Sequence, residues 1–254
     1  MSTPRLITIP FSHFCDKARW ALQRRGIAFV EDGHLPLFHF LAVRRAGGNR
    51  TVPALALADR LIGDSTEILQ WADAQPAPGP RLYPEGVADE ALALEEDFDR
   101  HLGPATRRWA YGFILPDRGL IREVARHGAP SWQRAGLELG LPIARYVMRK
   151  AMRIDDAGVA RSRVKIDEVF DRVGERLADG RPYLTGDQLT AADITFAALA
   201  APALYPAEYG VPFPPVERFP AAIQAEVARL RAHPAGAFGL RIYAEDRAEE
   251  RRPR

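Results

Sequence analysis

The chain has 254 residues, 47% of them hydrophobic and 27% charged, with a formal net charge of +2, which are the values of a folded globular protein rather than a disordered or fibrous one. Because so small a charge gives little attraction toward phosphate backbones, we expect no nucleic-acid partner. The chain has one cysteine, no apolar stretch of bilayer length and no signal-peptide pattern in its opening MSTPRLITIP, so we expect no disulfide, no metal site, no membrane segment and a cytoplasmic location.

The first part of the chain alternates short apolar runs with helical patterns, which is typical of a mixed sheet covered by helices. A weak helical pattern at residues 33–50 ends in Gly47-Gly48, which indicates a turn. The expected order is strand, helix, strand, helix, two strands and helix. The clearer elements are strands at Leu6–Ile9 and Ala28–Glu31, a helix at Ser12–Arg25, a strand hairpin at Ala54–Leu57 and Leu61–Ile62, and a helix that begins at Asp64.

A proline-rich stretch, QPAPGPRLYP at Gln75–Pro84, marks the expected domain boundary, because its four prolines remove backbone donors and fix an extended backbone. We therefore expect a first domain at residues 1–77, a linker at 78–84 and a second domain at 85–254. Beyond the linker the pattern becomes helical and predicts a bundle. Two apolar stripes carry this pattern: Ile166, Val169, Phe170, Val173 and Leu177, then Ile223, Val227 and Leu230.

Two regions of the bundle depart from this helical pattern. Prolines at positions 104, 116, 130 and 142 are expected to break its first half into pieces. The last ten residues are so charged that we expect them to fray or to extend as a solvated helix.

Four short motifs carry the candidate chemistry. SHFC places Ser12 at a helix entry, where free backbone amides and the helix dipole stabilise an anion. TVPAL places Pro53 at the start of a strand, and GDSTE begins a helix with an acid and hydroxyls that suit the ammonium and carboxylate of an amino acid. In LTAADI, Thr190 and Asp193 form a capping box, which indicates a structural role.

The order and spacing of SHFCDKARWAL, TVPAL, GDSTEIL and LTAADITFAAL resemble the cytosolic glutathione transferase family. The resemblance covers essentially the whole chain, most strongly residues 1–77 and Pro182–Leu199. It implies an α+β thioredoxin-like N-terminal domain with the order βαβαββα and a mixed sheet, followed by an all-α helical bundle. It also implies a homodimer, a role in detoxification, glutathione as cosubstrate and a hydrophobic electrophile as the second substrate.

The resemblance implies a role for each motif in the first domain. Val52, beside a family-typical cis Pro53, matches the residue whose backbone pairs with the cysteinyl part of glutathione. Asp64 and Ser65 match the acidic-Ser pair that takes the γ-glutamyl end. Ser12 matches the serine whose hydroxyl hydrogen-bonds the glutathione sulfur and so activates it.

Two departures from the family pattern bear on glutathione binding. The acid of the second motif is Asp64 where the family usually has Glu. The glycyl carboxylate has only the pairs Arg44-Arg45 and Asn49-Arg50 as candidate partners, and the sequence does not choose between them.

Structural alternatives stand beside these assignments. Ser12 is also a good helix cap, and a lone Cys15 is more often a small packed side chain than a reactive one. His13 has no identifiable acid to orient it as a base. Trp109 and Tyr111 either line a substrate pocket or belong to the core.

Two rival functions remain open. The first is a non-catalytic, glutathione-binding or scaffolding protein with the same fold. The second is a glutathione-dependent thiol-disulfide reductase that uses Cys15.

Overall fold

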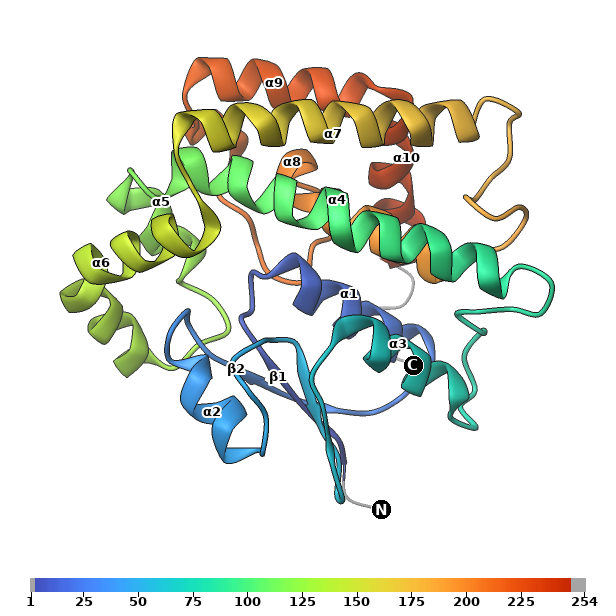
Figure 1. Cartoon of the computed structure of the whole chain (residues 1–254), viewed down its shortest axis with the longest axis horizontal. Coiled ribbons are helices and arrows are strands. Elements are labelled where there is room, and N and C mark those ends of the chain that lie inside the picture. The colour runs from blue at the N-terminus through green and yellow to red at the C-terminus, as the bar shows by residue number, and fades with distance from the viewer. Residues whose placement is uncertain (1–2, 248–254) are drawn as a thin grey trace.

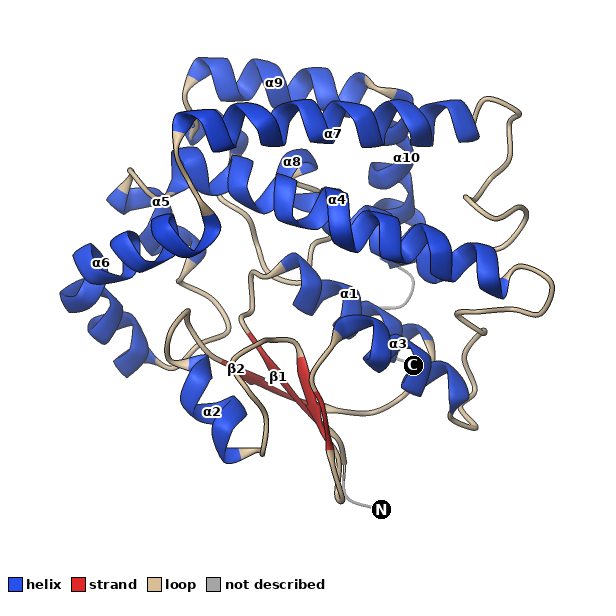
Figure 2. Cartoon of the chain, viewed as in Figure 1, coloured by secondary structure: helices blue, strands red, loops and turns tan. Residues whose placement is uncertain are grey.

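The structure is a computed structural model that describes residues 3–247, and its elements form two parts (Figure 1). Figure 2 shows that the strands of the described chain all lie in the first part. The first part contains β1 Arg5–Thr8, α1 His13–Arg24, β2 Val30–Gly33, α2 His39–Arg45, β3 Ala54–Ala56, β4 Leu61–Ile62 and α3 Ser65–Ala74. The second part contains α4 Ala88–Ile114, α5 Arg118–Val124, α6 Ser131–Met152, α7 Asp156–Arg176, α8 Ala191–Leu204, a 3-10 turn at Val216–Arg218, α9 Ala221–Ala232, α10 Pro234–Ile242 and a π-helical turn at Tyr243–Arg247.

The sheet of the first part has four strands in the order β2-β1-β3-β4. Strand β1 runs parallel to β2 and antiparallel to β3, and β4 is antiparallel to β3, so the sheet is mixed. Successive residues of a strand point to opposite faces. Leu6 accordingly packs with the α1 and α3 cluster, whereas Ile7 packs with Val43 of α2 on the other face. This is the predicted thioredoxin-like domain.

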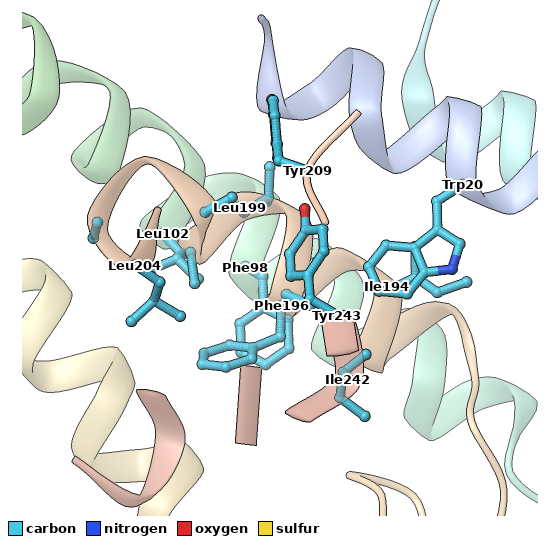
Figure 3. Packing of buried hydrophobic residues seen from close by; sticks show 14 of the residues in the cluster. Trp20, Phe98, Leu102, Ile194, Phe196, Leu199, Leu204, Tyr209, Ile242 and Tyr243 are labelled. Carbon is cyan, nitrogen blue, oxygen red and sulfur yellow. The ribbon is translucent and has the colours of Figure 1, made fainter. Parts of the chain in front are cut away.

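The second part is the predicted helical domain, built around α8, in which every residue is buried. Helices α4 and α7 pack against each other, and α8 packs against α4 and α10. Figure 3 shows side chains of α4, α8 and α10 meeting in one core, where the rings of Phe98 and Phe196 lie edge to face with centroids 5.4 Å apart. The capping box at the start of α8 is present, with the Thr190 amide 2.7 Å from Asp193 Oδ2.

Helix α1 lies between the sheet and the helical domain (Figure 1), and this position buries its polar side chains as well as its apolar ones. Trp20 packs on Tyr243 of the π-helical turn with ring centroids 5.0 Å apart (Figure 3). Asp16 on the same helix accepts hydrogen bonds from Arg19, Tyr243 and Arg247. These contacts hold α1 between the two domains.

The segment between α3 and α4 is fixed on α1 by one guanidinium group. Arg25, the residue that follows α1, donates to the carbonyl oxygens of Ala72 and Gln75 at 3.2 and 2.9 Å, and it also donates to Gly79. The division at 1–77, 78–84 and 85–254 stays a prediction.

Local differences from the predicted elements have local causes. Strand β2 is Val30–Gly33, two residues later than predicted, because its pairing with β1 sets Val30 opposite Arg5. Helix α1 begins at His13, with Ser12 as the residue that precedes it. The turn predicted at Gly47 is present, with a φ of 88° that favours glycine.

The expectation that four prolines break the helical domain is wrong for two of them. Pro116 and Pro130 lie between helices, whereas Pro104 lies inside α4 and Pro142 inside α6. A proline inside a helix costs about 3 kcal/mol through its missing amide and ring clash. In α4 this cost is offset by a face that is buried against α7 and α8.

Of the charged C-terminal segment, only residues 245–247 lie within the described part, and the rest of that prediction falls outside it. The expectation of a solvated tail is wrong for Arg247, which is fully buried. Its guanidinium lies 5.1 Å from the Trp20 ring and 3.1 Å from Asp16 Oδ1, so the charge is buried with partners from α1. Within residues 3–247 no helix is long and apolar enough to cross a membrane.

Candidate functional site

A cavity of about 320 Å³ lies between the thioredoxin-like domain and the helical domain. Its walls come from the loop that leads into α1, the start of α2, the loop before Pro53, and helices α4, α6 and α8. Most of the lining is apolar, and no carboxylate among the described residues lines it. The polar side chains of the lining are Ser12, His13, His39, Arg50, Thr51, Arg107, Tyr111 and Tyr205.

Ser12 occupies the N-cap position of α1 without capping the helix through its side chain. Its φ and ψ of −76° and 126° are extended, and its hydroxyl makes no hydrogen bond to the first amides of α1. Its backbone amide instead donates to Ile9 O at 2.9 Å. Ser12 is half-buried and lines the cavity, so its hydroxyl lies where a ligand could reach it.

His13 fastens the start of α1 to α4. Its Nε2 lies 2.9 Å from the carbonyl oxygen of Gly103, which can only accept, so Nε2 carries a proton. Burial, together with the positive charge of Arg107 nearby, lowers the pKa of His13 to about 3. The helices approach closely here, since a Cβ on Gly103 would lie 2.5 Å from Phe14 Cζ. His13 is therefore a neutral anchor, and nothing in its surroundings makes it a base for Ser12.

Cys15 is fully buried in the first turn of α1. Burial raises the pKa of its thiol to about 11, although hydrogen bonds from the Ile9 backbone and the Ser12 hydroxyl act in the opposite direction. A buried thiol that stays protonated at neutral pH is a poor nucleophile. This agrees with the interpretation of Cys15 as a packed side chain.

The Val52–Pro53 peptide bond is cis. Val52 lines the cavity, and within the described residues neither its amide nor its carbonyl takes part in a backbone hydrogen bond. Pro53 itself is buried behind this edge. The loop is tied to the start of α3, because the Thr51 hydroxyl donates to Gly63 O at 3.3 Å.

Asp64 and Ser65 lie at the start of α3 and are not part of the cavity lining. Asp64 is exposed and caps the helix through Oδ1, which accepts from the amides of Thr66 and Glu67 at 2.8 and 3.2 Å. Ser65 is buried, and no described group pairs with its amide or its hydroxyl. The structure thus brings Ser12 and Val52 together in the cavity lining. Asp64 and Ser65 lie outside this lining, next to Gly63, which accepts the hydrogen bond from Thr51.

A buried ion cluster under the start of α3 was not predicted from the sequence. Lys17 Nζ lies 2.7 Å from Glu95 Oε1 and 2.6 Å from Asp99 Oδ2, and Thr66 of α3 donates toward the same two carboxylates. Lys17 and Glu95 are fully buried. The cluster joins α1, α3 and α4, and so fixes the position of Ser65 relative to Ser12.

Two arginines face the cavity from opposite domains. Of the candidates for a carboxylate partner in the first domain, only Arg50 lines the cavity, and its guanidinium lies 5.8 Å from the Phe40 ring centroid. Arg107 lines the cavity from α4, and burial lowers its pKa below the usual value of an arginine. Arg107 carried no signal in the sequence, because arginine is common on exposed helix faces.

Of the two aromatic residues Trp109 and Tyr111, one lines the cavity and the other belongs to the core. Tyr111 lines the cavity, and burial raises its pKa to about 12. Trp109 lies in the core instead, with its ring 5.2 Å from that of Phe113. Side chains two residues apart on a helix point in different directions, which accounts for the division.

Comparison with known proteins matches the chain to two family profiles. Residues 6–81 match the family described as Glutathione S-transferase, N-terminal domain, and residues 156–233 match Glutathione S-transferase, C-terminal domain. Together the two matched segments span more than half of the 254 residues. A search of curated protein sequences finds no match.

Solved structures show the same fold at low sequence identity. The beta-etherase LigF from Sphingobium sp. strain SYK-6 has a TM-score of 0.59 and 21% identity over 94% of this chain and 98% of its own. The theta class glutathione S-transferase from Xanthomonas axonopodis pv. citri, with glutathione bound, has a TM-score of 0.55 and 20% identity over 94% and 98%. A glutathione S-transferase of Ceriporiopsis subvermispora in complex with glutathione has a TM-score of 0.66 and 15% identity over 100% and 99%.

Proposed function

The chain belongs to the glutathione transferase family, and we propose that it uses the Ser12 hydroxyl to activate the thiol of glutathione for attack on a hydrophobic electrophile. One observation carries this proposal. The hydroxyl stands at the start of α1, is not used to cap that helix, and lines the cavity together with the free backbone edge of Val52.

The residues around this hydroxyl suit the three parts of glutathione. The unused amide and carbonyl of Val52 would pair with the cysteinyl backbone, which sets the sulfur near Ser12. The unpaired amide and hydroxyl of Ser65 would take the γ-glutamyl carboxylate, and Asp64 would take its ammonium. Arg50 would take the glycyl carboxylate, since Arg44, Arg45 and Asn49 lie outside the cavity lining.

In this reaction the protein activates the glutathione thiol and orients it toward the electrophile. A free thiol has a pKa of about 8.5, so only a few per cent is thiolate at neutral pH. A hydroxyl that donates to the thiolate contributes about 1.5–3 kcal/mol, which lowers that pKa by about 1–2 units. The sulfur then forms a bond to the electrophilic carbon, the leaving group departs with its electron pair, and the thiol proton passes to solvent. The apolar walls from α4 and α6 would hold the electrophile.

The test compares Ser12→Ala with Ser12→Thr, which keeps a hydroxyl. We expect Ser12→Ala to bind glutathione and to lose most of its turnover with a chlorodinitrobenzene at neutral pH, while Ser12→Thr retains more. Equal turnover in the wild type and Ser12→Ala would show that Ser12 has no role in activating the thiol.

The two rival functions predict other results. A non-catalytic member would be retained on immobilised glutathione without turnover of any electrophile in a panel. A reductase acting through Cys15 would need that thiol exposed and ionised, and both its burial and its raised pKa oppose this.

We further propose that the protein works as a cytoplasmic homodimer with a role in detoxification, as the family resemblance implies. Light scattering on the purified protein tests the assembly. A mass of twice 28.2 kDa is expected, and a mass of 28.2 kDa would contradict it.

A further inference from the structure

Arg107 faces the cavity with a positive charge that no described residue neutralises. It lines the cavity from α4, and its Nε is buried without a hydrogen-bond partner. No carboxylate among the described residues lines the cavity, and His13 beside it is neutral. Burial lowers the pKa of Arg107, but a guanidinium stays charged in proteins.

Arg108, the next residue of α4, has a structural role that Arg107 lacks. Arg108 donates to Met152 O at 2.8 Å and to Ser162 Oγ at 3.0 Å, and so joins α4 to α6 and α7. Arg107 makes no comparable contact within the described residues. Arg107 is half-buried, so its guanidinium has lost part of its hydration without gaining a protein partner. Such a cation in a cavity wall indicates an anion supplied by a ligand.

Two tyrosine hydroxyls add to the polar part of an otherwise apolar lining. Tyr205, at the end of α8, lines the cavity and has a buried hydroxyl without a hydrogen-bond partner. Tyr111 lies one turn after Arg107 on α4, and its pKa of about 12 keeps it protonated and able to donate at neutral pH. An oxyanion on a ligand would satisfy such donors, whereas a hydrocarbon would leave them unpaired.

We propose that Arg107 binds a carboxylate on the electrophile, so that the preferred second substrate is a hydrophobic carboxylate rather than a neutral hydrophobic molecule. This inference rests on the proposed function. The apolar side chains of Ile114 and Met148 line the same cavity and would hold the body of the substrate. Arg50 lies on the thioredoxin-like side and would serve glutathione, so each anion would have its own cation.

A matched pair of probes separates charge from shape. The first is a chlorodinitrobenzoate with chlorine para to the carboxylate, and the second is the corresponding chlorodinitrobenzamide. In both, the glutathione sulfur forms a bond to the chlorine-bearing carbon and chloride leaves with the electron pair of the broken bond. The carboxylate takes no part in the bond changes, so a difference in KM between the probes reports its binding.

The decisive readout is binding of the chlorine-free dinitrobenzoate and dinitrobenzamide, measured by calorimetry, because it needs no turnover. The wild type is expected to prefer the benzoate. Arg107→Met is expected to weaken benzoate binding by about 10- to 100-fold and to leave the benzamide and glutathione affinities unchanged. Arg100→Met, which removes an exposed arginine of α4 outside the cavity lining, should behave as the wild type.

Three binding results would overturn the inference. They are no benzoate preference in the wild type, an equal loss for both probes in Arg107→Met, and a loss of glutathione affinity in that variant, which would assign Arg107 to glutathione. A benzoate preference that Arg107→Met abolishes, in a protein without turnover, supports the carboxylate site and instead refutes the proposed function.

Thermal unfolding of the ligand-free protein checks that Arg107→Met acts through binding. Methionine fills a similar volume and removes an unpaired, half-buried charge, so the melting temperature of Arg107→Met should equal or exceed that of the wild type. A clear decrease would assign Arg107 to folding and would contradict the inference.

Discussion

Replacing Ser12 with alanine removes one hydroxyl at the start of α1. The helix should lose little stability, because this hydroxyl makes no bond to the first amides of α1. If the hydroxyl instead donates to the glutathione thiolate, the loss of about 1.5–3 kcal/mol raises the pKa of the bound thiol by about 1–2 units.

In Ser12→Ala the rate of thiolate attack is expected to fall by a smaller factor than the thiolate fraction does, because a more basic thiolate is a better nucleophile. With a Brønsted coefficient of about 0.45, a pKa increase of 1–2 units lowers the rate about 4- to 13-fold at pH values below both pKa values. Above both pKa values, the same coefficient makes Ser12→Ala about 3- to 8-fold faster than the wild type.

The assay is the single-turnover rate with a chlorodinitrobenzene across pH, with both substrates saturating, for the wild type, Ser12→Ala and Ser12→Thr. The two curves of the wild type and Ser12→Ala should cross. A uniform decrease at every pH would indicate lost orientation rather than lost thiol activation, and superimposable profiles would refute the role of Ser12 outright.

Three further predictions concern residues near the cavity and α1. Cys15→Ala is expected to keep transferase activity and to lower only the melting temperature, because the thiol is buried and protonated; a loss of activity without a loss of stability would favour the reductase alternative. Arg50→Met is expected to weaken glutathione binding about two- to fivefold, since Arg50 is exposed, and Arg44→Met should change nothing in the same calorimetric titration. For Asp16, burial alone would raise the pKa, but Arg247 and Arg19 hold it below its usual value of 3.8, so its contribution to stability is present above about pH 4 and is lost as pH falls through the folded-state pKa. Asp16→Asn is therefore expected to lower the free energy of unfolding by about 3–5 kcal/mol near neutral pH and to flatten its decrease in acid, as urea titrations at several pH values would show; an unchanged acid profile would contradict this account.

The parts of the fold that follow from local sequence were predictable. Alternating apolar runs identified the strands, and Thr190 with Asp193 identified the start of α8. Ser12 was placed at a helix entry for the same reason, since cap positions depend on a few neighbouring residues.

Features that depend on distant partners were not predictable. The sequence around Lys17 or Arg247 is ordinary for a surface helix, yet both side chains are buried because their partners lie 82 and 231 positions away, in Asp99 and Asp16. Pro104 was misjudged for a similar reason, because the packing of α4 on its neighbours offsets a local penalty.

Arg107 shows the same limit at the candidate site. Arg107 stands out because no carboxylate among the described residues lines the cavity that it faces. The lining residues come from distant parts of the chain, so no short stretch of sequence shows this. The motif residues could be proposed from the sequence alone, whereas Arg107 could be proposed only once the cavity was described.

The most direct test of the central claim measures the ionisation of glutathione while it is bound. An ultraviolet difference titration of the thiolate absorbance is carried out on the glutathione complexes of the wild type and Ser12→Ala. The account predicts a bound-thiol pKa about 1–2 units below that of free glutathione in the wild type, and a value close to that of free glutathione in Ser12→Ala. The same pKa in both complexes would contradict it.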